Sequence, residues 1–114
     1  MPGISVHVVD AARGLPAAGL VVEIWALDGG RRRIAAGALS TRGTLDDAGL
    51  SAAGPGHYEA LFHVGDFYRG LGEALPEPPF LDVVPVRFGI ADAAQHYHLP
   101  LKLTPWGYSL FRGA

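Results

Sequence analysis

The sequence predicts a single all-β domain, covering residues 1–114, with about eight strands in two packed sheets and one short helix. A chain of 114 residues, of which 49% are hydrophobic, can build one core but not two. Its 16 glycines and 9 prolines fall between short apolar runs and do not gather in one block. Those runs often alternate apolar and polar residues, which is the period of a strand with one buried face. Together these features favour a β-sandwich.

Three strands are expected in the N-terminal part of the chain, at residues 4–10, 20–27 and 32–38. In the first, Ile4, Val6 and Val8 share one side, which is the natural core side. A turn at residues 13–16 follows it, and Gly29-Gly30 signals a hairpin between the other two. Residues 40–56 are small and polar, so that only one short strand near Thr44 is expected there.

Four further strands are expected in the C-terminal part, at residues 57–64, 81–90, 97–104 and 107–112. Residues 66–71 predict one or two helical turns, with Asp66 as the N-cap. Three prolines at positions 76, 78 and 79 then impose an extended connector. Pro85 lies inside an apparent strand and therefore implies an edge position, a bulge or a break.

Composition excludes several classes of function. The net charge is −2, and the one basic cluster, residues 31–33, is interpreted as a solvated hairpin, so we expect no nucleic-acid partner. No apolar run is long enough for a membrane span or resembles a secretory signal. The chain has no cysteine, which excludes disulfides and thiolate metal sites and favours a cytoplasmic location. A phosphate loop, a serine nucleophile elbow and a catalytic carboxylate pair are also missing.

Two histidines are expected on the outer face of one sheet. In the strand at 97–104, the leucines share the core side, which leaves His98 and Lys102 on the opposite side. His7 likewise faces away from the apolar side of the first strand. If both strands belong to one sheet, His7 and His98 leave it together. Such a face is either ordinary solvated surface or a protein interface that contains a polar pocket.

The remaining histidines offer weaker signals. His96 and His98 can chelate a metal from one strand face, but a zinc site needs three or four converging ligands, and the sequence does not supply them. We therefore expect no metal or other cofactor. His57 and His63 stand alone, and His63 is interpreted as packing or capping near the start of the helix.

Four separated motifs together resemble the 5-hydroxyisourate hydrolase branch of the transthyretin family. They are SVHVVDAARGLPA at residues 5–17, FLDVVPVRFGI at 80–90, HYHLP at 96–100 and PWGYSLFRGA at 105–114. The resemblance runs in order through essentially the whole chain. It implies a transthyretin-like two-sheet sandwich that assembles as a homotetramer, a dimer of dimers, with active sites in the clefts where two dimers meet. It also implies hydrolytic opening of the 5-hydroxyisourate ring, a step of urate degradation.

Residue by residue, the resemblance makes His7 and His98 the catalytic pair and Arg112 the substrate clamp. A neutral imidazole can take a proton from water near pH 7, because its ordinary pKa lies close to that pH. The guanidinium of arginine suits a planar anionic ring, because it offers a rigid fork of donors and a stacking surface. Which histidine acts as the base stays open.

The chain departs from the family pattern at the positions expected to bind substrate. The family ends in Tyr-Arg-Gly-Ser, whereas this chain ends in Phe111, Arg112, Gly113 and Ala114. A catalytic arginine in the middle of the family's sequence is replaced, in STRGTLD at residues 40–46, by Thr44, although Arg42 can reach the same cleft. Two alternatives therefore stand beside the hydrolase. One is a diverged enzyme that uses the same histidine pair on another small heterocycle or carbonyl compound, and the other is a non-catalytic binder of small ligands.

Overall fold

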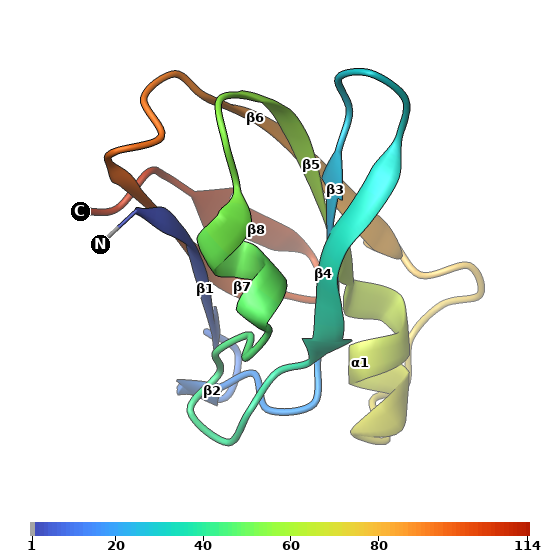
Figure 1. Ribbon diagram of the computed structural model, residues 1–114. Coiled ribbons are helices and arrows are strands. Elements are labelled where there is room, and N and C mark those ends of the chain that lie inside the picture. Colours follow the sequence, from blue (N-terminus) through green and yellow to red (C-terminus); the bar gives the residue numbers. More distant parts are fainter. Residues whose placement is uncertain (1) are drawn as a thin grey trace.

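Two four-stranded β-sheets pack against each other in the computed structural model, which describes residues 2–114 (Figure 1). The first sheet has the order β2-β1-β7-β8, with β1 at Gly3–Asp10, β2 at Leu15–Pro16, β7 at His96–Thr104 and β8 at Gly107–Leu110. The second has the order β4-β3-β5-β6, with β3 at Val21–Ala26, β4 at Arg32–Ala38, β5 at Gly56–His63 and β6 at Val83–Ile90. The predicted eight-stranded sandwich with one short α-helix is confirmed.

The first sheet is built around a parallel pair that joins the two ends of the sequence. β1 and β7 pair in parallel over eight residues, from Gly3 opposite His96 to Asp10 opposite Leu103. The other strand pairs are antiparallel. Both termini consequently lie at the same end of the molecule (Figure 1). This register decides which side chains of β1 and β7 are neighbours.

The core lies between the sheets and is formed by the apolar side of each alternating strand. Burying one aliphatic side chain of this kind stabilises the fold by about 1.5–3 kcal/mol. The fully enclosed residues of β1 and β7 face the enclosed residues of β3 and β5 across the sandwich. The least exposed apolar side chains are Val6, Val8, Ala17, Leu20, Val22, Ile24, Ala60, Phe62, Val64, Tyr68, Leu101 and Leu103.

Asp10 is the one carboxylate in this region that is completely buried, within residues 2–114. The Tyr68 hydroxyl donates to its Oδ1 at 2.9 Å, and Arg13 pairs with its Oδ2. The Ala12 amide also donates to Oδ1, at 3.1 Å. Burial and this carboxylate together raise the pKa of Tyr68, so the phenol stays protonated and keeps donating. These bonds compensate the burial of the charge and hold the end of β1 against the helix.

The helix differs from its prediction in its start and its cap. It covers Val64–Gly70 as α1, two residues earlier than expected, because β5 runs directly into it. The N-cap is His63, whose side chain makes no capping bond, and Asp66 lies in the first turn instead. Asp66 pairs with Arg69 at 2.9 Å, one turn along the helix. The prediction of Asp66 as the cap was therefore wrong.

Smaller differences concern connecting segments. The predicted turn at residues 13–16 is confirmed at Arg13 and Gly14, whose amides donate to the Asp10 carbonyl, and the two-residue strand β2 takes up its second half. The 3₁₀ helix η1 (Ala48–Ala52), which the sequence did not suggest, follows the short extended segment at Thr44. β8 ends at Leu110, earlier than predicted, and the chain then returns to β7 through a bridge between His98 and Gly113. Pro85 lies on β6, an edge strand, which is one of the three predicted options.

The arginine cluster at residues 31–33 is not simply solvated. The Arg31 guanidinium lies 4.5 Å from the centre of the Trp25 ring and donates to Glu59 Oε1 at 2.7 Å. Arg87 donates to the other oxygen of Glu59 at 3.1 Å. Because Glu59 is nearly buried on the outer side of β5, its charge needs these partners. The cluster is exposed, as predicted, and its Arg31 is in addition held by contacts within the second sheet.

Candidate active site

The parallel register of β1 and β7 brings the two predicted histidines onto one face. Ser5 lies opposite His98, and His7 lies opposite Pro100. The neighbouring residues Val6 and Leu99 point into the core, so the alternation sends Ser5, His7 and His98 outward. The two imidazoles therefore leave the same sheet on the same side, as the sequence predicted.

A pocket of about 430 Å³ opens on this face. Four of the predicted site residues line it, namely His7, His98, Arg42 and Thr44. Its other walls are formed by Ile4, Ser5, Val6, Leu45, Asp46 and Leu50. The pocket thus combines two imidazoles, a guanidinium, hydroxyls and a carboxylate above an apolar floor, which is the usual composition of a small-molecule site.

The loop before η1 positions Thr44 and Arg42. The Val8 amide donates to the Gly43 carbonyl at 2.9 Å, and the Leu45 amide donates to the Val6 carbonyl at 3.3 Å. Gly43 has a φ of +77°, and a Cβ there would lie 2.6 Å from the Val8 carbonyl oxygen. Only glycine allows the loop to approach β1 this closely. Thr44 is consequently held opposite His7 at the mouth of the pocket.

The C-terminal segment packs against His98. The Gly113 amide donates to the His98 carbonyl at 2.8 Å. A Cβ on Gly113 would lie 2.6 Å from Cδ2 of the His98 ring. Phe111 and Ala114 flank this contact and are exposed. The chain end is therefore tied to β7, and Gly113 forms one wall of the surroundings of the His98 imidazole.

Arg112 lies apart from the pocket in the single chain. Its Nη2 donates to Gln95 Oε1 at 2.9 Å and to the His96 carbonyl at 3.1 Å. The guanidinium also stacks over Tyr97, 4.1 Å from the ring centre. Since Tyr97 belongs to the core side of β7, Arg112 is held at the open end of the sandwich. The structure therefore brings His7, His98, Arg42 and Thr44 together but leaves Arg112 outside that group.

Ser5 and His96 are site residues that sequence reasoning did not assign. The Ser5 hydroxyl lies 2.6 Å from His98 Nδ1 and 2.7 Å from His96 Nε2. Both ring nitrogens are therefore directed at one oxygen and do not open together onto a common metal position. The sequence signal for Ser5 was its position two residues before His7 on β1, which places both side chains on the outer face of the sheet.

Burial lowers the pKa of His98 below its ordinary value, and the nearby His7 and His96 lower it further. A lowered pKa keeps the His98 ring neutral near pH 7. Its Nδ1 is engaged by Ser5, so Nε2 is the ring nitrogen left for chemistry. A neutral, oriented imidazole in a pocket can accept a proton from water.

The other two histidines belong to the second sheet and have structural partners. His63 Nε2 lies 2.6 Å from Glu23 Oε2, which lowers the pKa of Glu23. His57 Nδ1 lies 3.1 Å from Asp28 Oδ1 on the surface. His63 packs beside the helix start, as predicted, but its ring binds a carboxylate and does not cap the helix.

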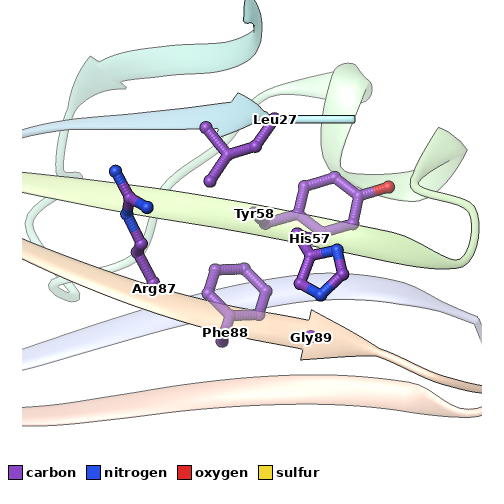
Figure 2. Close-up of a pocket in the computed structure, with 6 residues that line it drawn as sticks. All are labelled: Leu27, His57, Tyr58, Arg87, Phe88 and Gly89. Carbon is purple, nitrogen blue, oxygen red and sulfur yellow. The ribbon is translucent and has the colours of Figure 1, made fainter. Parts of the chain in front are cut away.

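A second pocket, of about 330 Å³, lies on the second sheet (Figure 2). Leu27, Tyr58 and Phe88 form its apolar part, and His57, Arg87 and Gly89 complete its lining. Among the residues that line it, His57 is the one histidine, and its ring already binds Asp28. The pocket on the first sheet, where two imidazoles converge, offers the stronger chemistry.

The described part of the chain, residues 2–114, lacks two kinds of feature. None of the helices described there is both long and apolar enough to cross a membrane. Within the same residues, no three histidine, aspartate or glutamate side chains gather in a way that could hold a metal ion.

Comparison with known proteins gives the same family throughout. The model of the HIUase/Transthyretin family matches residues 4–113. The chain is 45% identical to 5-hydroxyisourate hydrolase 2 of Rhizobium meliloti, with 97% of this chain and 95% of that protein covered. It is 47% identical to 5-hydroxyisourate hydrolase of Mesorhizobium japonicum, over 97% of this chain and 91% of that protein.

Solved structures agree with these sequence matches. The structure of Klebsiella pneumoniae 5-hydroxyisourate hydrolase superposes with a TM-score of 0.80 at 26% identity, covering 100% of both chains. Fold, motifs and relatives thus point in one direction, and the chain belongs to the HIUase/Transthyretin family.

Proposed function

We propose that this protein hydrolyses 5-hydroxyisourate, opening its ring at an amide bond in the degradation of urate. Relatives that carry this activity in their names align along nearly the whole chain. The observation that carries the proposal is the convergence of His7 and His98 in one pocket on the outer face of the first sheet. A carrier of small ligands has no need of two imidazoles arranged in this way.

His98 is the better candidate for the base. Its lowered pKa keeps it neutral, and its bond to Ser5 fixes the ring with Nε2 as the remaining nitrogen. In the proposed reaction Nε2 takes a proton from water as the oxygen attacks the ring carbonyl. The amide carbon–nitrogen bond then breaks, and the proton goes to the departing nitrogen. Water is the only co-reactant, so the atoms balance without a cofactor.

A cation near the carbonyl would stabilise the oxyanion that forms during attack. His7 and Arg42 both line the pocket and can supply positive charge or donors there. We assign this role to Arg42, because Thr44 occupies the place where the family carries its arginine. His7 stays with His98 in the pair that activates water. The Thr44 hydroxyl is bonded to Ser40 Oγ at 2.8 Å and is part of the wall.

Arg112, Phe111, Gly113 and Ala114 remain the proposed substrate-binding end of the chain. For Arg112 to act as a clamp, its guanidinium must leave Gln95 and the His96 carbonyl. Such a change is compatible with assembly, because these residues lie at the chain end and Phe111 is 59% exposed.

We further propose a homotetramer in which the outer face of β7 and β8 is covered by a neighbouring copy. Trp106, Tyr108 and Phe111 are 61%, 46% and 59% exposed in the single chain and lie in or beside β8. Aromatic side chains exposed to this degree indicate an interface. A partner over this face would close the pocket from above, in a protein expected to act in the cytoplasm. Light scattering at micromolar concentration tests this, and a stable monomer would contradict a shared site.

One alternative has support of its own. The changes at Thr44, Phe111 and Ala114 all fall on positions that the family uses to hold substrate. A diverged enzyme would keep the His7–His98 pair and act on another small heterocyclic or carbonyl compound.

The decisive experiment follows fresh product of urate oxidase by ultraviolet absorbance, with and without the purified protein. The proposal expects the absorbance of 5-hydroxyisourate to decay faster in the presence of wild-type protein and at the spontaneous rate with His98→Asn. An unchanged decay with the wild-type protein would refute it. Binding of 5-hydroxyisourate without turnover would favour the small-ligand binder, and turnover of a different ring compound would favour the diverged enzyme.

A further inference from the structure

Behind the proposed base lies a chain of three polar side chains. It runs from His98 Nδ1 to the Ser5 hydroxyl, 2.6 Å away, and on to His96 Nε2, at a further 2.7 Å. Both distances are short for hydrogen bonds to a hydroxyl. The two rings are two residues apart on β7, and Ser5 comes from β1 beside them. The serine therefore bridges two imidazoles that cannot bond each other.

A hydroxyl has only one proton, which restricts the protonation of the rings. If the Ser5 hydroxyl donates to one nitrogen, it accepts from the N–H of the other. When His98 carries its proton on Nδ1, the hydroxyl donates to His96 Nε2, and the His96 proton lies on Nδ1. When His96 carries its proton on Nε2, the hydroxyl donates to His98 Nδ1, and the His98 proton lies on Nε2. As long as the hydroxyl donates to one ring and accepts from the other, neutral His96 and His98 share the same tautomer.

No other contact competes for this choice. His96 Nδ1 is buried and has no hydrogen-bond partner within residues 2–114. His98 Nε2 likewise has no protein partner among the hydrogen bonds described for this part of the chain, and His98 lines the pocket. The outer nitrogen of each ring, His96 Nδ1 and His98 Nε2, is therefore without a protein partner in residues 2–114, and the serine is the group that couples one ring to the other.

We propose that Ser5 and His96 are positioning residues that form a proton relay behind His98 and set its tautomer. The catalytic part of this inference rests on the proposed function. In the resting state His98 holds Nδ1–H, which leaves Nε2 bare to accept a proton from water. As Nε2 gains that proton, the Nδ1 proton moves to Ser5 Oγ, and the Ser5 proton moves to His96 Nε2. His98 ends neutral with Nε2–H, and the positive charge rests on His96.

The relay has a physical advantage at this site. Without it, the reaction would leave an imidazolium at His98, in the pocket and near His7. The transfer moves this charge one ring away from the pocket and gives His98 a proton that it can donate to the departing nitrogen. One side chain then serves first as base and later as acid.

The first test reads the tautomers directly and needs no substrate. Protein labelled with ¹⁵N-histidine is examined by long-range proton–nitrogen NMR at a pH where the rings are neutral. We expect His96 and His98 both to carry their proton on Nδ1, with His57 and His63 as internal references. Opposite tautomers on His96 and His98, or protons on Nε2 of both rings, would overturn the relay, whatever the activity of the protein.

The second test uses variants of the hydroxyl. In Ser5→Ala the coupling is lost, and we expect kcat for 5-hydroxyisourate to fall by about tenfold to a hundredfold with little change in KM. Ser5→Thr keeps a hydroxyl at a strand position that suits a β-branched residue, so it should restore most of the rate and the shared tautomer. Ser51→Ala is the matched control, because the Ser51 hydroxyl bonds only the Ala48 carbonyl of its own turn.

The two proposals fail in different ways. If the tautomers match but 5-hydroxyisourate is not hydrolysed, the relay stands and the substrate assignment falls. If hydrolysis occurs and Ser5→Ala leaves kcat, the pH profile and the His98 tautomer unchanged, the relay is refuted and the hydrolase stands. Should Ser5→Ala unfold, the tautomers of the wild-type protein and the rate of Ser5→Thr still decide the question.

Discussion

Gly113 touches the ring of His98, so that Gly113→Ala is expected to displace this imidazole. The added Cβ would lie 2.6 Å from Cδ2 and 3.2 Å from both Cβ and Cγ of His98. Carbon atoms in favourable contact are about 3.5–4.0 Å apart, so ring and chain must separate by about 1 Å. Neither side yields freely, because the Gly113 amide bonds the His98 carbonyl and Ser5 holds the ring.

A displacement of about 1 Å of a catalytic group commonly lowers the rate by about a hundredfold. We therefore expect kcat/KM of Gly113→Ala for 5-hydroxyisourate to fall by about that factor. The free energy of unfolding should fall by about 1–3 kcal/mol, the usual cost of adding a methyl group where the packing leaves no room for it. Stopped-flow ultraviolet absorbance measures the first quantity, and urea denaturation measures the second.

Gly70→Ala provides the control, because a Cβ at Gly70 meets no atom within 4 Å. It should leave kcat/KM unchanged. If Gly113→Ala were as active as Gly70→Ala while the His98 resonances kept their positions, the packing of the chain end on this ring would have no part in catalysis. The placement of His98 at the reacting centre would then be wrong.

Three further outcomes follow from the structure. Burial and neighbouring histidines lower the pKa of His98. The acid limb of the pH profile of kcat/KM should therefore have its midpoint below about 6.5, the ordinary pKa of histidine. A midpoint above that value would exclude His98 as the base. Arg42 is exposed and has no ion pair within residues 2–114, so Arg42→Ala should leave Tm unchanged. We expect it to lower kcat/KM by about a hundredfold. An unchanged rate would show that Arg42 does not stabilise the oxyanion. Leu101 is fully buried on β7, so Leu101→Ala should reduce the free energy of unfolding by about 2–5 kcal/mol in urea denaturation. Leu15 is exposed, and Leu15→Ala should change this free energy by less than about 0.5 kcal/mol. Equal effects of the two substitutions would contradict the described core.

The alternation of apolar and polar residues predicted much of the fold and the side of the sheet on which His7 and His98 lie. It placed Val6 and Val8 in the core and His7 outside, and it did the same for the leucines and His98 of β7. This works because side chains alternate strictly along a strand, so one apolar face determines the direction of every other residue. The assignment of both histidines to one face needed only the additional assumption of a shared sheet.

The rest of the site depends on contacts between distant parts of the chain. Ser5 meets His98 because β1 and β7 pair in a particular parallel register, and more than 90 residues separate them. No local pattern encodes that register, since several pairings would bury the same apolar faces. The direction of Arg112 was missed for a similar reason: its guanidinium is held by Gln95 and the Tyr97 ring, which only the folded chain end brings near.

The proposed mechanism depends most on His7 and His98 acting as one unit, and a double-mutant cycle measures this directly. The experiment compares kcat/KM for 5-hydroxyisourate in His7→Asn, His98→Asn and the double variant. Residues that serve the same step lose little more together than singly, so we predict that the double variant is no more than about tenfold slower than the slower single variant. Rate losses that multiply in full, as for independent residues, would contradict a shared catalytic site on this face of the sheet.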